Sequence, residues 1–182
     1  FVPIDEQGAP LTDIIMYFAN SGSGEFDELV RRVGEETFMR VARILPDASY
    51  SLAKMLYTLR TAERPVWKFL PIAAYVCYRL SGAVMTDVSL ACRTLLYDVE
   101  KREWSRELLE ASGVALDQLP DVCPTGTAVG FLRPEIAQAL SLPENVRVVI
   151  GSHDQIVNAL ACGVCEHGDG VDVSGPRECL EP

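Results

Sequence analysis

The sequence predicts a globular α/β fold, and three observations support this prediction. Hydrophobic residues make up 48% and charged residues 23% of the 182 residues, which is ordinary for a chain that buries a core. Apolar runs of strand length occur among segments whose apolar residues recur at helical spacing. An apolar strand at 146–150 leads into a glycine turn, an aspartate and a further helix, a unit typical of α/β sheets.

The first half of the chain is predicted to hold two strands and four helices. Residues 1–4 and 14–19 are expected to form a hairpin-like pair of strands across a turn that contains Gly8 and Pro10. Apolar spacing then predicts helices over 26–33, 35–44, 49–60 and 65–80. Pro65 in the first turn of the fourth helix and Gly82 after its last turn support its bounds.

The second half alternates strands and helices. Thr86 and Asp87 are cap-type residues before a short segment at 88–92. Strands are expected over 94–98, 127–131, 146–150 and 168–174. Helices are expected over 104–112, 134–140 and 155–165, with a helical turn at 115–119.

Charge and composition exclude several classes of partner. The net charge of −10 argues against binding a nucleic-acid backbone or an anionic membrane. A phosphorylated ligand stays compatible, because backbone N–H groups can bind phosphate on an acidic protein. No secretion signal is visible, and the longest apolar stretch, 69–78, is too short for a membrane span. Six scattered cysteines favour a reducing cytoplasm over a disulfide scaffold.

Asp154 is the first candidate functional residue. It follows the apolar strand 146–150 and the turn at Gly151, at the edge of a sheet where α/β proteins bind ligands. A carboxylate placed there can act as a general base for a substrate hydroxyl. The alternative is that Asp154 caps the helix that starts at Gln155.

The other candidates are weaker. Asp172-Val173-Ser174-Gly175 is a strand that enters a small-residue turn, and it is either a phosphate-binding turn or an ordinary one. Cys162 and Cys165 form a single C-x-x-C pair without a second pair, so no metal site is expected. The sequence contains no G-x-S-x-G elbow, P-loop or G-x-G-x-x-G.

Several segments occur together in the order found in one family. They are Ile4-Asp5-Glu6-Gln7-Gly8-Ala9-Pro10-Leu11, Tyr78-Arg79-Leu80-Ser81-Gly82, Thr86-Asp87-Val88-Ser89-Leu90-Ala91-Cys92-Arg93-Thr94-Leu95-Leu96-Tyr97-Asp98, Trp104 with Glu107-Leu108-Leu109 and Gly113, Leu119-Pro120, and Gly151-Ser152-His153-Asp154-Gln155. With this set, the chain resembles the FGGY carbohydrate kinases. The resemblance implies part of a ribonuclease-H-like (actin-like ATPase) fold.

The resemblance also implies an activity: ATP-dependent phosphorylation of a hydroxyl of a small sugar or polyol, with Mg²⁺. Asp154 would be the catalytic base, and Phe18, Asn20 and Gln155 would bind the substrate. Ser174 and Gly175 would meet nucleotide phosphate. Residues 1–153 would be the back part of the N-terminal sugar-binding domain. Residues 154–182 would hold the catalytic Asp, a linking helix and the first strand of the nucleotide-binding domain.

The sequence departs from the family at several positions. Phe18 and Asn20 stand where Trp and Asp are usual, Gly22 replaces an Arg, and Pro176 replaces a Thr and donates no backbone N–H. These departures keep open a second hypothesis, a catalytically inactive relative that serves as a binding or regulatory module. An actin-like structural ATPase is disfavoured, because the matching segments belong to the sugar-kinase branch.

The family's N-terminal Asp-x-Gly phosphate motif and most of its nucleotide domain are missing from the sequence. We therefore expect an incomplete chain that transfers no phosphate by itself. The identity of the sugar is left open, and so is the oligomeric state, with a homodimer among the alternatives.

Overall fold

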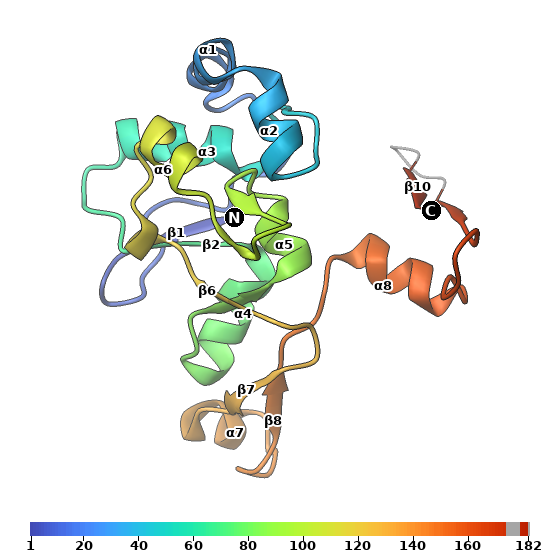
Figure 1. Ribbon diagram of the computed structural model, residues 1–182. Coiled ribbons are helices and arrows are strands. Elements are labelled where there is room, and N and C mark those ends of the chain that lie inside the picture. The colour runs from blue at the N-terminus through green and yellow to red at the C-terminus, as the bar shows by residue number, and fades with distance from the viewer. Residues whose placement is uncertain (174–178, 182) are drawn as a thin grey trace.

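The computed structural model describes residues 1–173 and 179–181 (Figure 1). The α-helices in this part of the chain are α1 (Ser23–Val33), α2 (Glu35–Val41), α3 (Ser51–Thr61), α4 (Ile72–Ser81), α5 (Val88–Cys92), α6 (Arg106–Ser112), α7 (Pro134–Ala139) and α8 (Asp154–Ala161), with a short 3-10 helix η1 (Leu116–Gln118). The strands are β1 (Val2–Ile4), β2 (Lys68–Leu70), β3 (Met85–Asp87), β4 (Tyr97–Asp98), β5 (Glu103–Trp104), β6 (Asp121–Cys123), β7 (Ala128–Phe131), β8 (Arg147–Val149), β9 (Val171–Val173) and β10 (Cys179–Glu181).

The strands pair two by two. Four pairs are antiparallel, β1 with β2, β4 with β5, β7 with β8 and β9 with β10. The pair β3–β6 is parallel, with Asp87 opposite Cys123. A parallel pair needs a long crossover, and here α5, β4, β5, α6 and η1 supply it. Strand β3 therefore ends at Asp87 beside elements that are distant in the sequence.

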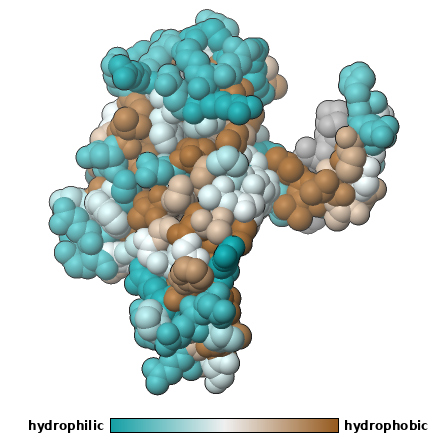
Figure 2. All heavy atoms as spheres, turned by 60° about the horizontal axis from the view of Figure 1, so that its bottom comes forward, coloured by the Kyte–Doolittle hydropathy of each residue, from teal (hydrophilic) through white to brown (hydrophobic). Residues whose placement is uncertain are grey.

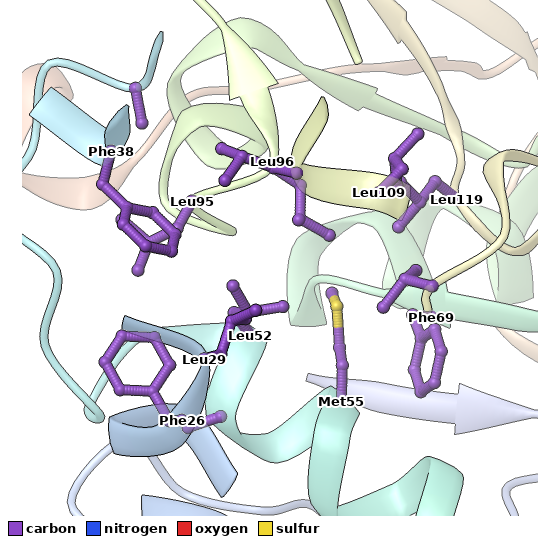
Figure 3. Close-up of a cluster of buried hydrophobic side chains, with 14 of the residues drawn as sticks. Phe26, Leu29, Phe38, Leu52, Met55, Phe69, Leu95, Leu96, Leu109 and Leu119 are labelled. Carbon is purple, nitrogen blue, oxygen red and sulfur yellow. The ribbon is translucent and has the colours of Figure 1, made fainter. Parts of the chain in front are cut away.

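The main hydrophobic core lies where helices α1, α2, α3 and α6 face one another (Figure 3). Phe26, Phe38 and Leu52 come from three different helices and are at most 2% exposed. Leu95 and Leu96, from the segment between α5 and β4, are fully buried against them. Burying each such side chain stabilises the fold by roughly 1.5–3 kcal/mol. The amphipathic helices predicted in this region are confirmed.

Two smaller clusters each include a residue of helix α4. One contains Ala74 with Val2 and Leu70 of the β1–β2 pair. The other contains Cys77 with Val148 and Ile150, which belong to β8 and its end. Ile150 also pairs with Thr127 through its backbone N–H (2.9 Å). The strand that leads into the turn at Gly151 is thus anchored on the body of the molecule.

The predicted strand over 14–19 is wrong. These residues form no strand, and Ile14, Met16 and Phe18 are 51%, 48% and 64% exposed. The partner of β1 is β2, which is more than 60 residues away in the sequence, although Ile4 makes one antiparallel bridge to Pro10. An apolar run of strand length does not reveal whether a partner is available, because pairing is decided by tertiary contacts.

The predicted helix over 65–80 is correct only from Ile72 onward. Its first residues form β2, where Phe69 and Leu70 are fully buried, and Pro71 is the residue before the helix. Short apolar runs do not separate a buried strand from a helix by periodicity alone. Strands β3, β5, β6 and β10 were not predicted either, because two or three residues are too few to show a strand period. The helices expected over 104–112 and 155–165 are shorter in the structure, at Arg106–Ser112 and Asp154–Ala161.

Helix α8 projects from the body of the molecule, at the right of Figure 1. It exposes the apolar side chains of Ile156, Val157 and Leu160, which are 44%, 49% and 64% exposed. Figure 2 shows the hydrophobic surface of this projecting arm. Among the described residues, none of the helices has the length and apolar character needed to cross a membrane.

Candidate active site at the turn before helix α8

Asp154 is the first residue of α8 and its carboxylate faces solvent. Its side chain is 85% exposed, and Oδ1 accepts a hydrogen bond from the backbone N–H of Gln155 (2.9 Å). The N-terminus of a helix stabilises negative charge within its first turn. The position therefore offers an accessible carboxylate, which is what a general base requires.

The cap of α8 is His153 and not Asp154. The imidazole Nδ1 of His153 accepts a hydrogen bond from the backbone N–H of Gln155 (3.3 Å). An accepting Nδ1 carries no proton, so its 3.3 Å contact with Oδ1 of Asp154 is not an ion pair in that state. The alternative in which Asp154 serves as the cap is thus wrong, because Asp154 is itself the first residue of the helix and His153 is the residue before it.

Asp87 is a fully buried carboxylate at the end of β3. It caps α5 as predicted, because Oδ2 accepts from the N–H of Ser89 (3.1 Å) and Oδ1 from the N–H of Leu90 (3.1 Å). Two hydroxyls, Oγ of Ser89 (2.5 Å) and Oγ1 of Thr125 (2.9 Å), also donate to Oδ2. A buried charge is tolerated only when it is hydrogen-bonded in this way.

Ser89 joins this buried carboxylate to the turn before Asp154. Its Oγ accepts hydrogen bonds from the backbone N–H of His153 (2.8 Å) and from Oγ of Ser152 (2.9 Å). The residues that it connects are more than 60 positions apart in the sequence. The sequence analysis found the cap at Asp87 but missed this role of Ser89. The only local signal is the Thr-Asp-x-Ser spacing, which does not say what the serine meets.

Gln155 lies beside Asp154 in the first turn of α8. Its Oε1 atom is buried and, among the described residues, makes no hydrogen bond. A buried amide oxygen without a donor carries a desolvation cost. It is therefore suited to accept a hydrogen bond from a ligand hydroxyl.

The other predicted substrate residues lie in the segment before α1. Phe18 is 64% exposed and packs edge-on against Tyr17, with ring centroids 5.2 Å apart. The carbonyl of Asn20 accepts from Oγ of Ser23 (2.9 Å) and so holds the start of α1. Gln155 follows Asp154 directly in α8, whereas Phe18 and Asn20 precede α1, which Figure 1 shows apart from α8.

Gly22 has a structural reason for being glycine. Its φ is +82°, and a Cβ there would lie 1.8 Å from the carbonyl oxygen of Ala53 in α3. With this backbone, the position at which the family carries Arg has no room for a side chain. The predicted nucleotide residues Ser174 and Gly175, and the departure at Pro176, lie outside the described residues.

No group of three or more His, Cys, Asp and Glu side chains within 1–173 and 179–181 is arranged to hold a metal ion. Asp87 is occupied by four donors from the protein. Cys162 and Cys165 are free, exposed thiols. We therefore assign no described residue to Mg²⁺.

Solved structures identify the class of fold. The structure is similar to the xylulose kinase of Rhodospirillum rubrum, with a TM-score of 0.86 and 23% identity over 94% of this chain and 36% of that one. It is also similar to the glycerol kinase of Plasmodium falciparum, with a TM-score of 0.88 and 16% identity over 98% of this chain and 37% of that one. The fold is part of the actin-like, ribonuclease-H-like class, as predicted.

The family follows from the sequence. The description "FGGY family of carbohydrate kinases, N-terminal domain" matches residues 1–161, which end with α8. The chain belongs to the FGGY family of carbohydrate kinases. It is 28% identical to the xylulose kinase of Lactococcus lactis, over all of this chain and 37% of the relative. It is 31% identical to the glycerol kinase of Thermococcus onnurineus, over 74% of this chain and 29% of the relative. The chain thus spans 37% and 29% of the length of these two relatives.

Proposed function

We propose that the protein takes part in ATP-dependent phosphorylation of a hydroxyl group on a small sugar or polyol. One observation carries the proposal: an exposed carboxylate, Asp154, begins α8 immediately after a turn that is tied to the body of a kinase-family domain. The relatives named xylulose kinase and glycerol kinase support a small polyhydroxylated substrate.

In the proposed reaction, Asp154 accepts the proton of the substrate hydroxyl. The hydroxyl oxygen forms a bond to the γ-phosphorus of ATP, and the bond from that phosphorus to the oxygen of ADP breaks. Such a transfer depends on positioning and charge stabilisation, so one well-placed base is sufficient on the protein side. ATP supplies the phosphoryl group, and Mg²⁺, which the family implies, would offset the charge of its phosphates.

The substrate would lie against Gln155 and, in the same proposal, against Phe18 and Asn20. The unpaired Oε1 of Gln155 supports the first contact. The exposed ring of Phe18 supports the second, because sugar rings present apolar C–H faces to aromatic side chains. Ser174 and Gly175 are proposed to meet the nucleotide. The division into 1–153 and 154–182 also stays a prediction.

The test uses the protein expressed from its whole gene. ADP release is measured against a panel of pentoses, ketoses and polyols. Asp154→Asn should lower kcat by about 10²- to 10⁴-fold, the usual contribution of a general base. Asp117→Asn removes another exposed carboxylate, on η1, and should leave kcat unchanged. Full activity of Asp154→Asn would refute the assignment.

A second function is favoured by the structure at Gly22. Because this position cannot take the family's Arg, the second candidate function is that of an inactive relative which binds a sugar as a regulatory module. Calorimetric sugar binding by the whole protein, with no ADP release across the panel, would establish that alternative.

A further inference from the structure

The hydroxyl of Ser89 uses every hydrogen bond that it can make. A serine hydroxyl has one donor and two acceptor lone pairs. The Oγ of Ser89 receives donors from Ser152 and His153, so its own hydrogen points to Oδ2 of Asp87 (2.5 Å). The two lone pairs then face the N–H of His153 (2.8 Å) and the hydroxyl of Ser152 (2.9 Å).

The direction of these hydrogen bonds is therefore set by the buried carboxyl group of Asp87. A hydroxyl that donates to a carboxylate becomes a better acceptor, because hydrogen bonds in a chain polarise one another. Asp87 is itself held by the backbone of α5 and by Thr125 (2.9 Å), so the chain of bonds starts from a rigid point. This chain of hydrogen bonds extends from Asp87, at the end of β3, to His153, the residue immediately before Asp154.

The turn has few other regular supports. Strand β8 ends at Val149 and α8 begins at Asp154, so Ser152 and His153 lie between two elements. Figure 1 shows α8 projecting away from the body on this connection. The hydrogen bonds to Ser89 thus fix the turn from which α8 starts. They therefore also fix the orientation of α8 and of the Asp154 carboxylate.

We propose that Ser89, supported by Asp87, is a positioning residue that holds the Ser152–His153 turn and thereby orients Asp154 for proton abstraction. This inference rests on the proposed function of Asp154. Ser89 touches neither substrate nor nucleotide in this proposal. Its loss should act on kcat, because misplacing a reacting group by about 1 Å can cost about 10²-fold in rate.

The test compares three variants of the protein expressed from its whole gene. Ser89→Ala removes all three bonds, and Ser89→Thr keeps the hydroxyl. Ser105→Ala is the matched control, because Ser105 is a buried serine that caps α6 and lies outside this network. Hydrogen exchange of the peptide over 150–156 reports the His153 amide, and steady-state kinetics report kcat and KM.

In Ser89→Ala we expect exchange at this peptide to accelerate by about tenfold, as for the loss of one charge-supported hydrogen bond. We expect kcat to fall by about 10- to 100-fold with KM changed much less. Ser89→Thr should keep most of the exchange protection and most of the kcat of the unmodified protein. Ser105→Ala should change neither the exchange rate of this peptide nor kcat.

Three results would overturn the proposal: unchanged exchange in Ser89→Ala, unchanged kcat in Ser89→Ala, or an equal fall of kcat in Ser105→Ala. A failure of the proposed function looks different, because Asp154→Asn would then keep full activity. In that case the exchange measurement alone decides whether Ser89 holds the turn.

Discussion

Replacing Gly22 by alanine tests whether close packing of α1 on α3 excludes a side chain at this position. A Cβ at Gly22 would meet the Ala53 carbonyl oxygen at 1.8 Å and the Tyr57 Cβ at 3.1 Å. Ala53 is fully buried within α3, so the obstacle is helix backbone that cannot rotate away. The residue must also keep a φ of +82°.

Two effects lower the free energy of unfolding in Gly22→Ala, and their magnitudes add. A left-handed conformation costs an alanine about 1–2 kcal/mol. Forcing extra volume into a packed contact costs about 1–3 kcal/mol more. We therefore expect the free energy of unfolding to fall by about 2–5 kcal/mol, a large part of the total for a domain of this size. The measurement is urea unfolding of the chain followed by circular dichroism.

Two control variants separate the costs. Gly113 has a φ of +75° but no atom within 4 Å of a Cβ, so Gly113→Ala should lose only the conformational part, about 1–2 kcal/mol. Gly24 lies inside α1, and no atom is within 4 Å of a Cβ there. Gly24→Ala should therefore raise the free energy of unfolding by about 0.5–1 kcal/mol. If Gly22→Ala costs no more than Gly113→Ala, the argument from the α3 contact is refuted.

Two further predictions concern titratable groups. Backbone N–H donation by Lys101 and Glu100 to the Asp98 carboxylate, together with its ion pair to Lys101 (3.1 Å), lowers the pKa of Asp98. Its stabilising contribution is therefore present above the unfolded value of about 3.9 and is lost as the pH falls through the lower folded pKa. Asp98→Asn should reduce the urea midpoint most at neutral pH and progressively less below about pH 4, and a constant difference would contradict this. Burial, and then the neighbouring Cys123, raises the pKa of the Cys77 thiol, whereas Cys162 is exposed. Iodoacetamide should therefore alkylate Cys162 before Cys77 under native conditions. Peptide mass spectrometry measures both sites, and equal rates would show that Cys77 is not buried.

The glycine and serine predictions bear on different parts of the proposed site. Gly22 concerns the segment that would bind substrate, and Ser89 concerns the turn that would hold the base. A stable Gly22→Ala variant would remove the structural reason for the missing Arg. A normal turn in Ser89→Ala would leave the orientation of Asp154 to α8 alone. The two results are independent, because the residues share no contact that we describe.

Local patterns in the sequence were enough to predict the class of fold, most of the helices and the family. Helical spacing of apolar residues is a local property, so α1, α2, α3 and α7 could be predicted from it. The carboxylate at Asp154 and the cap at Asp87 were also visible, because strand, turn and cap signals lie within a few residues of one another.

Which distant segments meet could be learned only from the three-dimensional fold. It pairs β1 with β2 instead of with residues 14–19, and it joins Ser89 to His153 across more than 60 residues. It also shows that Gly22 faces the α3 backbone. None of these contacts has a local signature, because each depends on how elements that are far apart in the chain bury their surfaces against one another.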